Sequence, residues 1–157
     1  MMPLLRSLLP TALLLGALAG AACSTDQDAV PEAASSLTVS EPRLVLPPPG
    51  RDTAAGYLTF GNQGQAPLVI QGLSSAAYER VEMHTMDHAD GMMRMRELPS
   101  IEVPAGDTVA LKPHGKHLMF IAPKGSLEPG DSVDVQINYA VADTTAQQRV
   151  RFRVEAR

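Results

Sequence analysis

The sequence predicts an all-β domain built as a Greek-key β-sandwich. Apolar and polar residues alternate along most of the chain after residue 36, and no stretch there shows the 3.6-residue period of an amphipathic helix. Turn-forming sequences rich in Pro, Gly, Asn and Asp separate the alternating stretches. The apolar positions are mostly Val, Ile and Leu, and aromatic residues make up only 4% of the chain. Short strands at short intervals are typical of sandwiches and barrels.

The expected strands follow the alternating stretches in chain order: 37–40, 55–61, 68–73, 80–86, 92–98, 108–112, 117–122, 132–139 and 148–155. Residues two apart on a strand share a face, so alternate residues of the last two stretches should fill the core. These core residues are Val133, Val135, Ile137, Tyr139, Val150, Phe152 and Val154. The arginines between them should lie on the solvent face, namely Arg149, Arg151 and Arg153.

Residues 1–22 have the pattern of an export signal and are excluded from the predicted fold. Arg6 precedes an apolar stretch from Leu8 to Leu18, which is followed by small residues. The stretch contains Pro10 and is shorter than the roughly 20 apolar residues that a membrane-spanning helix needs. We therefore expect the protein to be exported from the cytoplasm.

Cys23 is the only cysteine of the chain and directly follows the small residues of the signal. This arrangement resembles the lipobox of bacterial lipoproteins, whose cysteine is lipidated and becomes the new N-terminus. Lipoboxes usually carry Leu three residues before the cysteine, and here that position is Gly20, so ordinary signal cleavage nearby is the alternative. With a lipid anchor, Ser24 after the cysteine favours the outer membrane.

Residues 23–36 are polar, acidic and small, as in a flexible tether, and residues 37–157 have the length of one domain. The formal net charge is -4, and the sequence has no basic cluster. Nucleic acid is therefore not an expected partner.

Residues that can bind a soft metal ion are concentrated in one part of the chain. All four histidines and six of the eight methionines lie between positions 83 and 119. On the stretch 117–122, His117 and Met119 should share a face, while Leu118 and Phe120 point into the core. A hairpin turning through residues 88–91 pairs residues whose numbers sum to 179, and this register places His84 opposite Met95. A slip of the register by one residue would exchange Met95 for a neighbouring methionine.

Imidazole nitrogens together with thioether sulfurs form a soft, neutral ligand set, which selects Cu(I) over zinc, calcium or magnesium. Outside the cytoplasm, a pair of thiols risks oxidation to a disulfide, whereas a site of His and Met does not. The predicted metal ligands are His84, Met95, His117 and Met119. Taken singly, each of them could be a packing or surface residue, and it is the combination that indicates metal binding.

Ten residues separate His84 from Met95, twenty-one separate Met95 from His117, and one separates His117 from Met119. This spacing resembles that of the PCu(A)C periplasmic copper chaperones. The surrounding sequence is similar to this family too, over residues 56–64, 81–84, 91–96, 101–106 and 112–119. The resemblance implies a cupredoxin-like β-sandwich with one exposed Cu(I) site. It also implies delivery of copper to an acceptor protein, such as the dinuclear copper centre of cytochrome oxidase subunit II or the factors that assemble it.

The remaining residues of the cluster have simpler expected roles. Packing in the core or the hairpin is expected for Met83, Met92 and Met93, with an auxiliary copper role as the alternative. His88 and Met86, on or near the hairpin loop, could form a weak secondary site. A solvated turn is expected at His114, and Asp87 and Asp90 are expected to form turns.

Other functions fit the composition less well. A blue-copper electron carrier needs a thiolate ligand, and the predicted domain lacks cysteine. No motif pairs a nucleophile with a base, so we do not expect an enzyme. The main alternative is a copper-sequestering or resistance lipoprotein that stores the metal without specific delivery. A metal-free sandwich acting in adhesion or assembly is a further alternative, against which the His and Met cluster argues.

Overall fold

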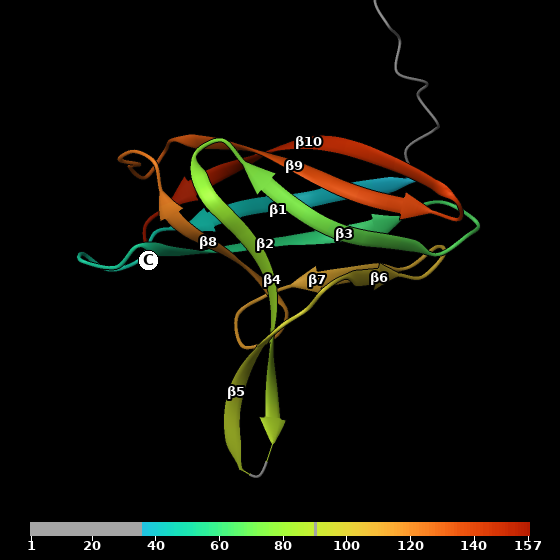
Figure 1. The fold of residues 1–157 in the computed structure, drawn as a ribbon, viewed down its shortest axis with the longest axis horizontal. Coiled ribbons are helices and arrows are strands. Elements are labelled where there is room, and N and C mark those ends of the chain that lie inside the picture. Colours follow the sequence, from blue (N-terminus) through green and yellow to red (C-terminus); the bar gives the residue numbers. More distant parts are fainter. Residues whose placement is uncertain (1–35, 90) are drawn as a thin grey trace, which may run out of the picture. The chain divides into compact units, whose positions relative to one another are not determined.

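The computed structural model describes residues 36–89 and 91–157, and its described regular structure is all β-strand (Figure 1). The strands are β1 (Leu37–Val45), β2 (Thr53–Asn62), β3 (Leu68–Ser75), β4 (Tyr78–Ala89), β5 (Met92–Glu97), β6 (Ile101–Val103), β7 (Thr108–Leu111), β8 (His117–Pro123), β9 (Ser132–Val141) and β10 (Thr144–Glu155). Within this part of the chain, no helix is long and apolar enough to cross a membrane.

The strands are hydrogen-bonded in the order β5-β4-β8-β2-β1-β10-β9-β3-β6, and β7 pairs separately with β2. A further pairing between β3 and β4, at Leu73 and Val81, closes the sheet on itself. Most neighbours are antiparallel, but β1 runs parallel to β10. The predicted all-β fold is confirmed, and the curved sheet encloses one core.

The core is formed by the alternate side chains that point inward from these strands. Three phenylalanines, Phe60, Phe120 and Phe152, are fully buried. The Phe120 ring packs edge-on against Tyr78 and Phe152, with ring centroids 5.2 and 5.6 Å apart. Burial raises the pKa of the Tyr78 phenol above its usual value.

The faces predicted for the last two strands are correct. The predicted core residues of β9 and β10 are buried, except that Val150 is only half-buried, and the three intervening arginines are exposed. All the expected strands are present, although most extend further than their apolar alternation indicated. The strand that the sequence did not reveal is β6, whose three residues are too few to show a period.

Asn62 at the end of β2 is a buried polar residue whose side-chain amide makes three hydrogen bonds. Its Nδ2 donates to the carbonyl oxygens of Ala66 (2.8 Å) and Val103 (3.0 Å), and its Oδ1 accepts from the backbone N–H of Gly64 (2.9 Å). Asn62 thereby ties the loop between β2 and β3 to β6.

The hairpin of β4 and β5 extends away from the other strands, as Figure 1 shows. The first part of β4 pairs with β8, from Tyr78 to His84, while β5 pairs with the second part, from His84 to Ala89. Only His84 pairs with both β8 and β5. It therefore lies where the hairpin leaves the body of the sandwich.

Candidate metal centre

His117 and Met119 lie on β8 with their side chains on the same face of the sheet. Leu118, which lies between them, and Phe120, which follows Met119, are completely buried, whereas His117 and Met119 are half-buried. The alternation predicted from the sequence is confirmed on this strand. The buried residues fix the orientation of β8, and through it the direction of the two potential ligands.

His84 on β4 is paired directly with His117 on β8. The centroids of the two imidazole rings are 6.0 Å apart, and the rings are inclined by 48°. The His84 side chain is only 13% exposed, since it lies where β4 is flanked on both sides. A metal ion between these rings would therefore have one protein-covered ligand and one that is more accessible.

In each of the two histidines, one ring nitrogen is hydrogen-bonded and the other remains available to a metal. His84 Nε2 lies 3.1 Å from Glu82 Oε2, and His117 Nδ1 lies 3.0 Å from the carbonyl oxygen of Gly115. Both partners are acceptors in their ordinary states, so these two ring nitrogens carry the hydrogens and donate. His84 Nδ1 is buried and has no hydrogen-bond partner among the described residues. A buried lone pair without a donor is unfavourable, and a bound metal ion would satisfy it.

The predicted register of the β4–β5 hairpin is wrong by two residues. Pairing continues as far as Ala89 and Met92, so Met95 lies opposite Met86, and His84 lies opposite Glu97. β4 thus ends at Ala89 and β5 begins at Met92, and the φ of Gly91 just before β5 is 74°. Short hairpin connections match the natural twist of the strands better than the four-residue loop that we expected.

As a result, Met95 lies diagonally across from His84 on the same face of the sheet. Diagonal neighbours are about 7–8 Å apart, which is within reach of a long side chain. Met119 is also diagonal to His84, on the other side, because it pairs with Glu82. The structure therefore brings the two histidines together directly and places one methionine on either flank, on three adjacent strands.

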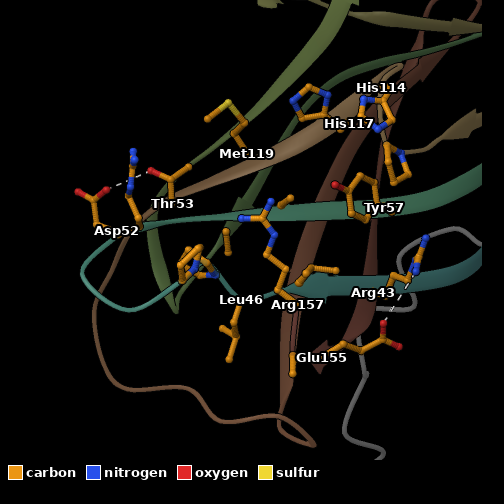
Figure 2. Close-up of a pocket in the computed structure, with 18 of the residues that line it drawn as sticks. Arg43, Leu46, Asp52, Thr53, Tyr57, His114, His117, Met119, Glu155 and Arg157 are labelled. Atoms are coloured by element: carbon orange, nitrogen blue, oxygen red, sulfur yellow. Dashed lines mark hydrogen bonds and ion pairs between the residues drawn. The ribbon is translucent and has the colours of Figure 1, made fainter.

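A groove of about 990 Å³ lies against one flank of the histidine pair. His117, Met119 and Met86 line it together with His114, whereas His84 and Met95 do not. Figure 2 shows His117 and Met119 at one wall, with Tyr57 of β2 and Arg157 further along the groove. The groove gives access to the potential ligands of β8.

Two carboxylates that sequence reasoning missed lie beside His84. Potential ligand atoms of Glu82, His84 and Glu97 all lie within 4.8 Å of one another. Glu82 also pairs with Arg80, at 3.2 Å. The spacing of Glu82 two residues before His84 could have revealed the shared face, but Glu97 depends on the hairpin register.

Some of the other residues of the His and Met cluster have their expected roles, and others do not. Met83 is buried, as predicted, and His114 is an exposed turn residue with a φ of 63°. Core packing is wrong for Met92 and Met93, which are exposed because the hairpin extends beyond the core. Asp87 does not form a turn.

Asp87 instead lies within β4 and pairs with Arg96 of β5. The side chain of His88 and the residue Asp90 lie outside the described part of the structure.

Residues 37–151 match the sequence model of the family described as "Putative lipoprotein LpqE-like". The chain belongs to this family. The matched region covers all strands from β1 into β10, including every predicted metal ligand. Among curated proteins, this LpqE-like chain is 27% identical over 143 residues to "Putative lipoprotein Lxx21020" of Leifsonia xyli subsp. xyli, a match that covers 90% of the chain and 86% of the relative.

Solved structures with the same fold include PCuAC domains. The copper-bound PCuAC domain from PmoF2 has a TM-score of 0.63 and 19% identity, covering 78% of the LpqE-like chain and 94% of the domain. The CuI-DR1885 structure from Deinococcus radiodurans has a TM-score of 0.59 and 24% identity, covering 81% and 85%. These likenesses confirm the predicted resemblance to the PCu(A)C family at the level of the fold.

Proposed function

We propose that this LpqE-like protein is a copper chaperone that binds one Cu(I) through His84, Met95, His117 and Met119. The observation that carries the proposal is the pair of neighbouring imidazoles, each with one nitrogen held as a hydrogen-bond donor and the other available. The copper-bound and CuI titles of two structural relatives support the choice of metal.

The ligand chemistry favours Cu(I) over harder ions. Two neutral imidazoles and two thioethers give a complex with the low charge of Cu(I) itself, and thioethers bind soft monovalent copper better than zinc or calcium. Because Met95 is 50% exposed, an incoming ligand can replace it without unfolding the site. Exchange of one weakly bound thioether at a time would pass copper to an acceptor without releasing it.

The proposed acceptor is a periplasmic copper protein, such as the dinuclear centre of cytochrome oxidase subunit II or its assembly factors. We propose that the signal in residues 1–22 exports the chain, and that a lipid on Cys23 holds it at the outer membrane through the tether of residues 23–36. Membership of a family described as putative lipoproteins supports the anchor. The domain of residues 37–157 would then act near a membrane surface.

The experiment is an anaerobic competition titration of the whole chain with Cu(I) against a chromogenic chelator. We expect one tightly held equivalent, which His117→Ala and Met119→Leu both weaken. His114→Ala is the matched control, because His114 lines the same groove but is not a proposed ligand. Unchanged affinity in the first two variants, each with a normal urea midpoint, would contradict the proposed ligand set.

Transfer kinetics separate a chaperone from a copper-sequestering protein. For a chaperone, the rate of copper transfer to the apo domain of oxidase subunit II should rise with acceptor concentration and exceed spontaneous dissociation into a chelator. A rate equal to dissociation at every acceptor concentration would favour sequestration.

A further inference from the structure

The β4–β5 hairpin carries an unusual concentration of exposed methionine. In the described residues, the large apolar side chains that are exposed are those of Met92 (54%), Met93 (43%) and Met95 (50%), all on β5. Scattered apolar residues are normal on a surface, but adjacent ones on one projecting element call for a functional explanation.

The strand register sorts these methionines onto two faces. Met93 and Met95 are two residues apart and share a face, whereas Met92 lies on the opposite face with Arg94 and Arg96. Directly across from Met95 is Met86 of β4. One face of the hairpin therefore presents three thioethers, and the opposite face holds the Arg96–Asp87 ion pair.

The separations suit a single metal ion. Directly opposed residues such as Met86 and Met95 have Cβ atoms about 5 Å apart. Met93 and Met95 are about 7 Å apart along the strand. Methionine is unbranched with three rotatable bonds, so three sulfurs at these spacings can converge on one point. Neutral thioether donors are selective for Cu(I) and for its close analogue Ag(I).

We propose that Met86, Met93 and Met95 form a second, outer Cu(I) site on the hairpin. It goes beyond the four-ligand site and rests on the proposed function only through Met95, which both sites use. With both sites filled, the inner ion keeps His84, His117 and Met119, and the outer ion takes the three thioethers.

The position of Met86 connects the two sites. Its side chain lines the groove together with His117 and Met119, while its backbone pairs with that of Met95. Copper held by the outer thioethers is therefore adjacent to the inner histidines. The hairpin would collect Cu(I) from solution and pass it inward by exchange of shared ligands.

The test uses the whole chain under anaerobic conditions, titrated with Cu(I) and separately with Ag(I), which is not redox-active. We expect a second, weaker equivalent in the wild type that Met86→Leu/Met93→Leu loses while it retains the first. Leucine keeps the apolar surface and removes only the sulfur. Met92→Leu, an equally exposed methionine on the opposite face, is the matched control and should keep both equivalents.

Resonances of ¹³C-labelled methionine methyl groups give an independent readout. Those of Met86 and Met93 should shift with the second equivalent, and that of Met92 should not. If the double variant still holds two equivalents, or if Met92→Leu loses the second one equally, the outer site is wrong.

A His84→Ala/His117→Ala variant separates the two proposals. Loss of the tight equivalent with retention of the weaker one, and shifts still confined to Met86, Met93 and Met95, would support both sites. If that variant binds as the wild type does while the thioether shifts persist, the proposed inner site fails and the outer site remains. If the thioether shifts are absent in every variant, the outer site fails.

Discussion

His84 and His117 lie directly opposite each other on two hydrogen-bonded strands, and a hydrogen-bond acceptor orients each ring. Strand pairing holds the backbones of both residues, and buried neighbours hold the strands. The rings therefore do not need to be gathered from mobile loops when a metal arrives. A site pre-arranged in this way binds without a large cost in conformational entropy.

The carboxylate of Glu82 should tune copper affinity without touching the metal. It accepts a hydrogen bond from His84 Nε2, which fixes the tautomer and makes the imidazole a stronger donor at Nδ1. Glu82→Gln removes the negative charge at nearly constant shape. We expect Cu(I) affinity in chelator competition to fall about 10- to 100-fold, the range for such partners.

Glu79→Gln is the control for that change, because Glu79 is an exposed glutamate of the same strand, five residues away from His84. Urea unfolding of both apo variants should match the wild type closely. An unaltered affinity in Glu82→Gln would mean that the carboxylate does not orient His84 in the copper complex.

The buried amide of Asn62 should contribute strongly to stability. In Asn62→Asp the side chain can no longer donate to the carbonyl oxygens of Ala66 and Val103, and a carboxylate would face them instead. Leaving buried groups unsatisfied costs about 1–3 kcal/mol, and more when a charge is involved. We expect the free energy of unfolding in urea at neutral pH to fall by at least about 2 kcal/mol.

Gln63→Glu makes the same amide-to-acid change at the adjacent exposed position and should alter stability by less than about 0.5 kcal/mol. Equal effects of the two substitutions would show that the hydrogen bonds of Asn62 are not responsible.

Gly56 of β2 should be required for the close approach of β2 and β8. A Cβ at this position would overlap the edge of the Phe120 ring and lie 3.1 Å from Leu118 Cβ. Gly56→Ala should therefore destabilise the fold by about 1–3 kcal/mol, as for an overpacked core, measured by urea unfolding. Gly72→Ala on β3 is the control, since a Cβ there meets nothing within 4 Å. If both glycines tolerate alanine, the packing at Gly56 is looser than the structure indicates.

Local sequence was sufficient to predict the faces of individual strands. Burial of Leu118 and Phe120 beside half-buried His117 and Met119 follows from a period of two, which is a property of the backbone. The pairing of His84 with His117 could not be predicted in the same way. It joins strands that are far apart in the sequence, and nothing in either strand alone specifies its neighbour.

The hairpin accounts for the failure of the predicted register, of core packing for Met92 and Met93, and of a turn at Asp87. The register between His84 and Met95 depended on the assumed loop length, and a difference of two residues moved Met95 from a directly opposed to a diagonal position. Core packing, one of the roles expected for Met92 and Met93, is wrong because apolar character does not reveal where a core ends. The hairpin leaves the core at His84, and later residues of the same strand pair face solvent.

The parallel pairing of β1 with β10 joins the strands that come first and last along the described chain, with Leu44 opposite Val154. β1 occupies an interior place between β2 and β10, so its second edge stays open until the final strand has been synthesised. Such long-range closure is slow, because the entropy of the intervening chain must be lost before any contact repays it. Until then, the exposed edges of β1 and β9 can pair with other chains. Assembly of the histidine pair on β4 and β8, whose strands are complete well before β10, can thus precede closure of the sheet that supports them.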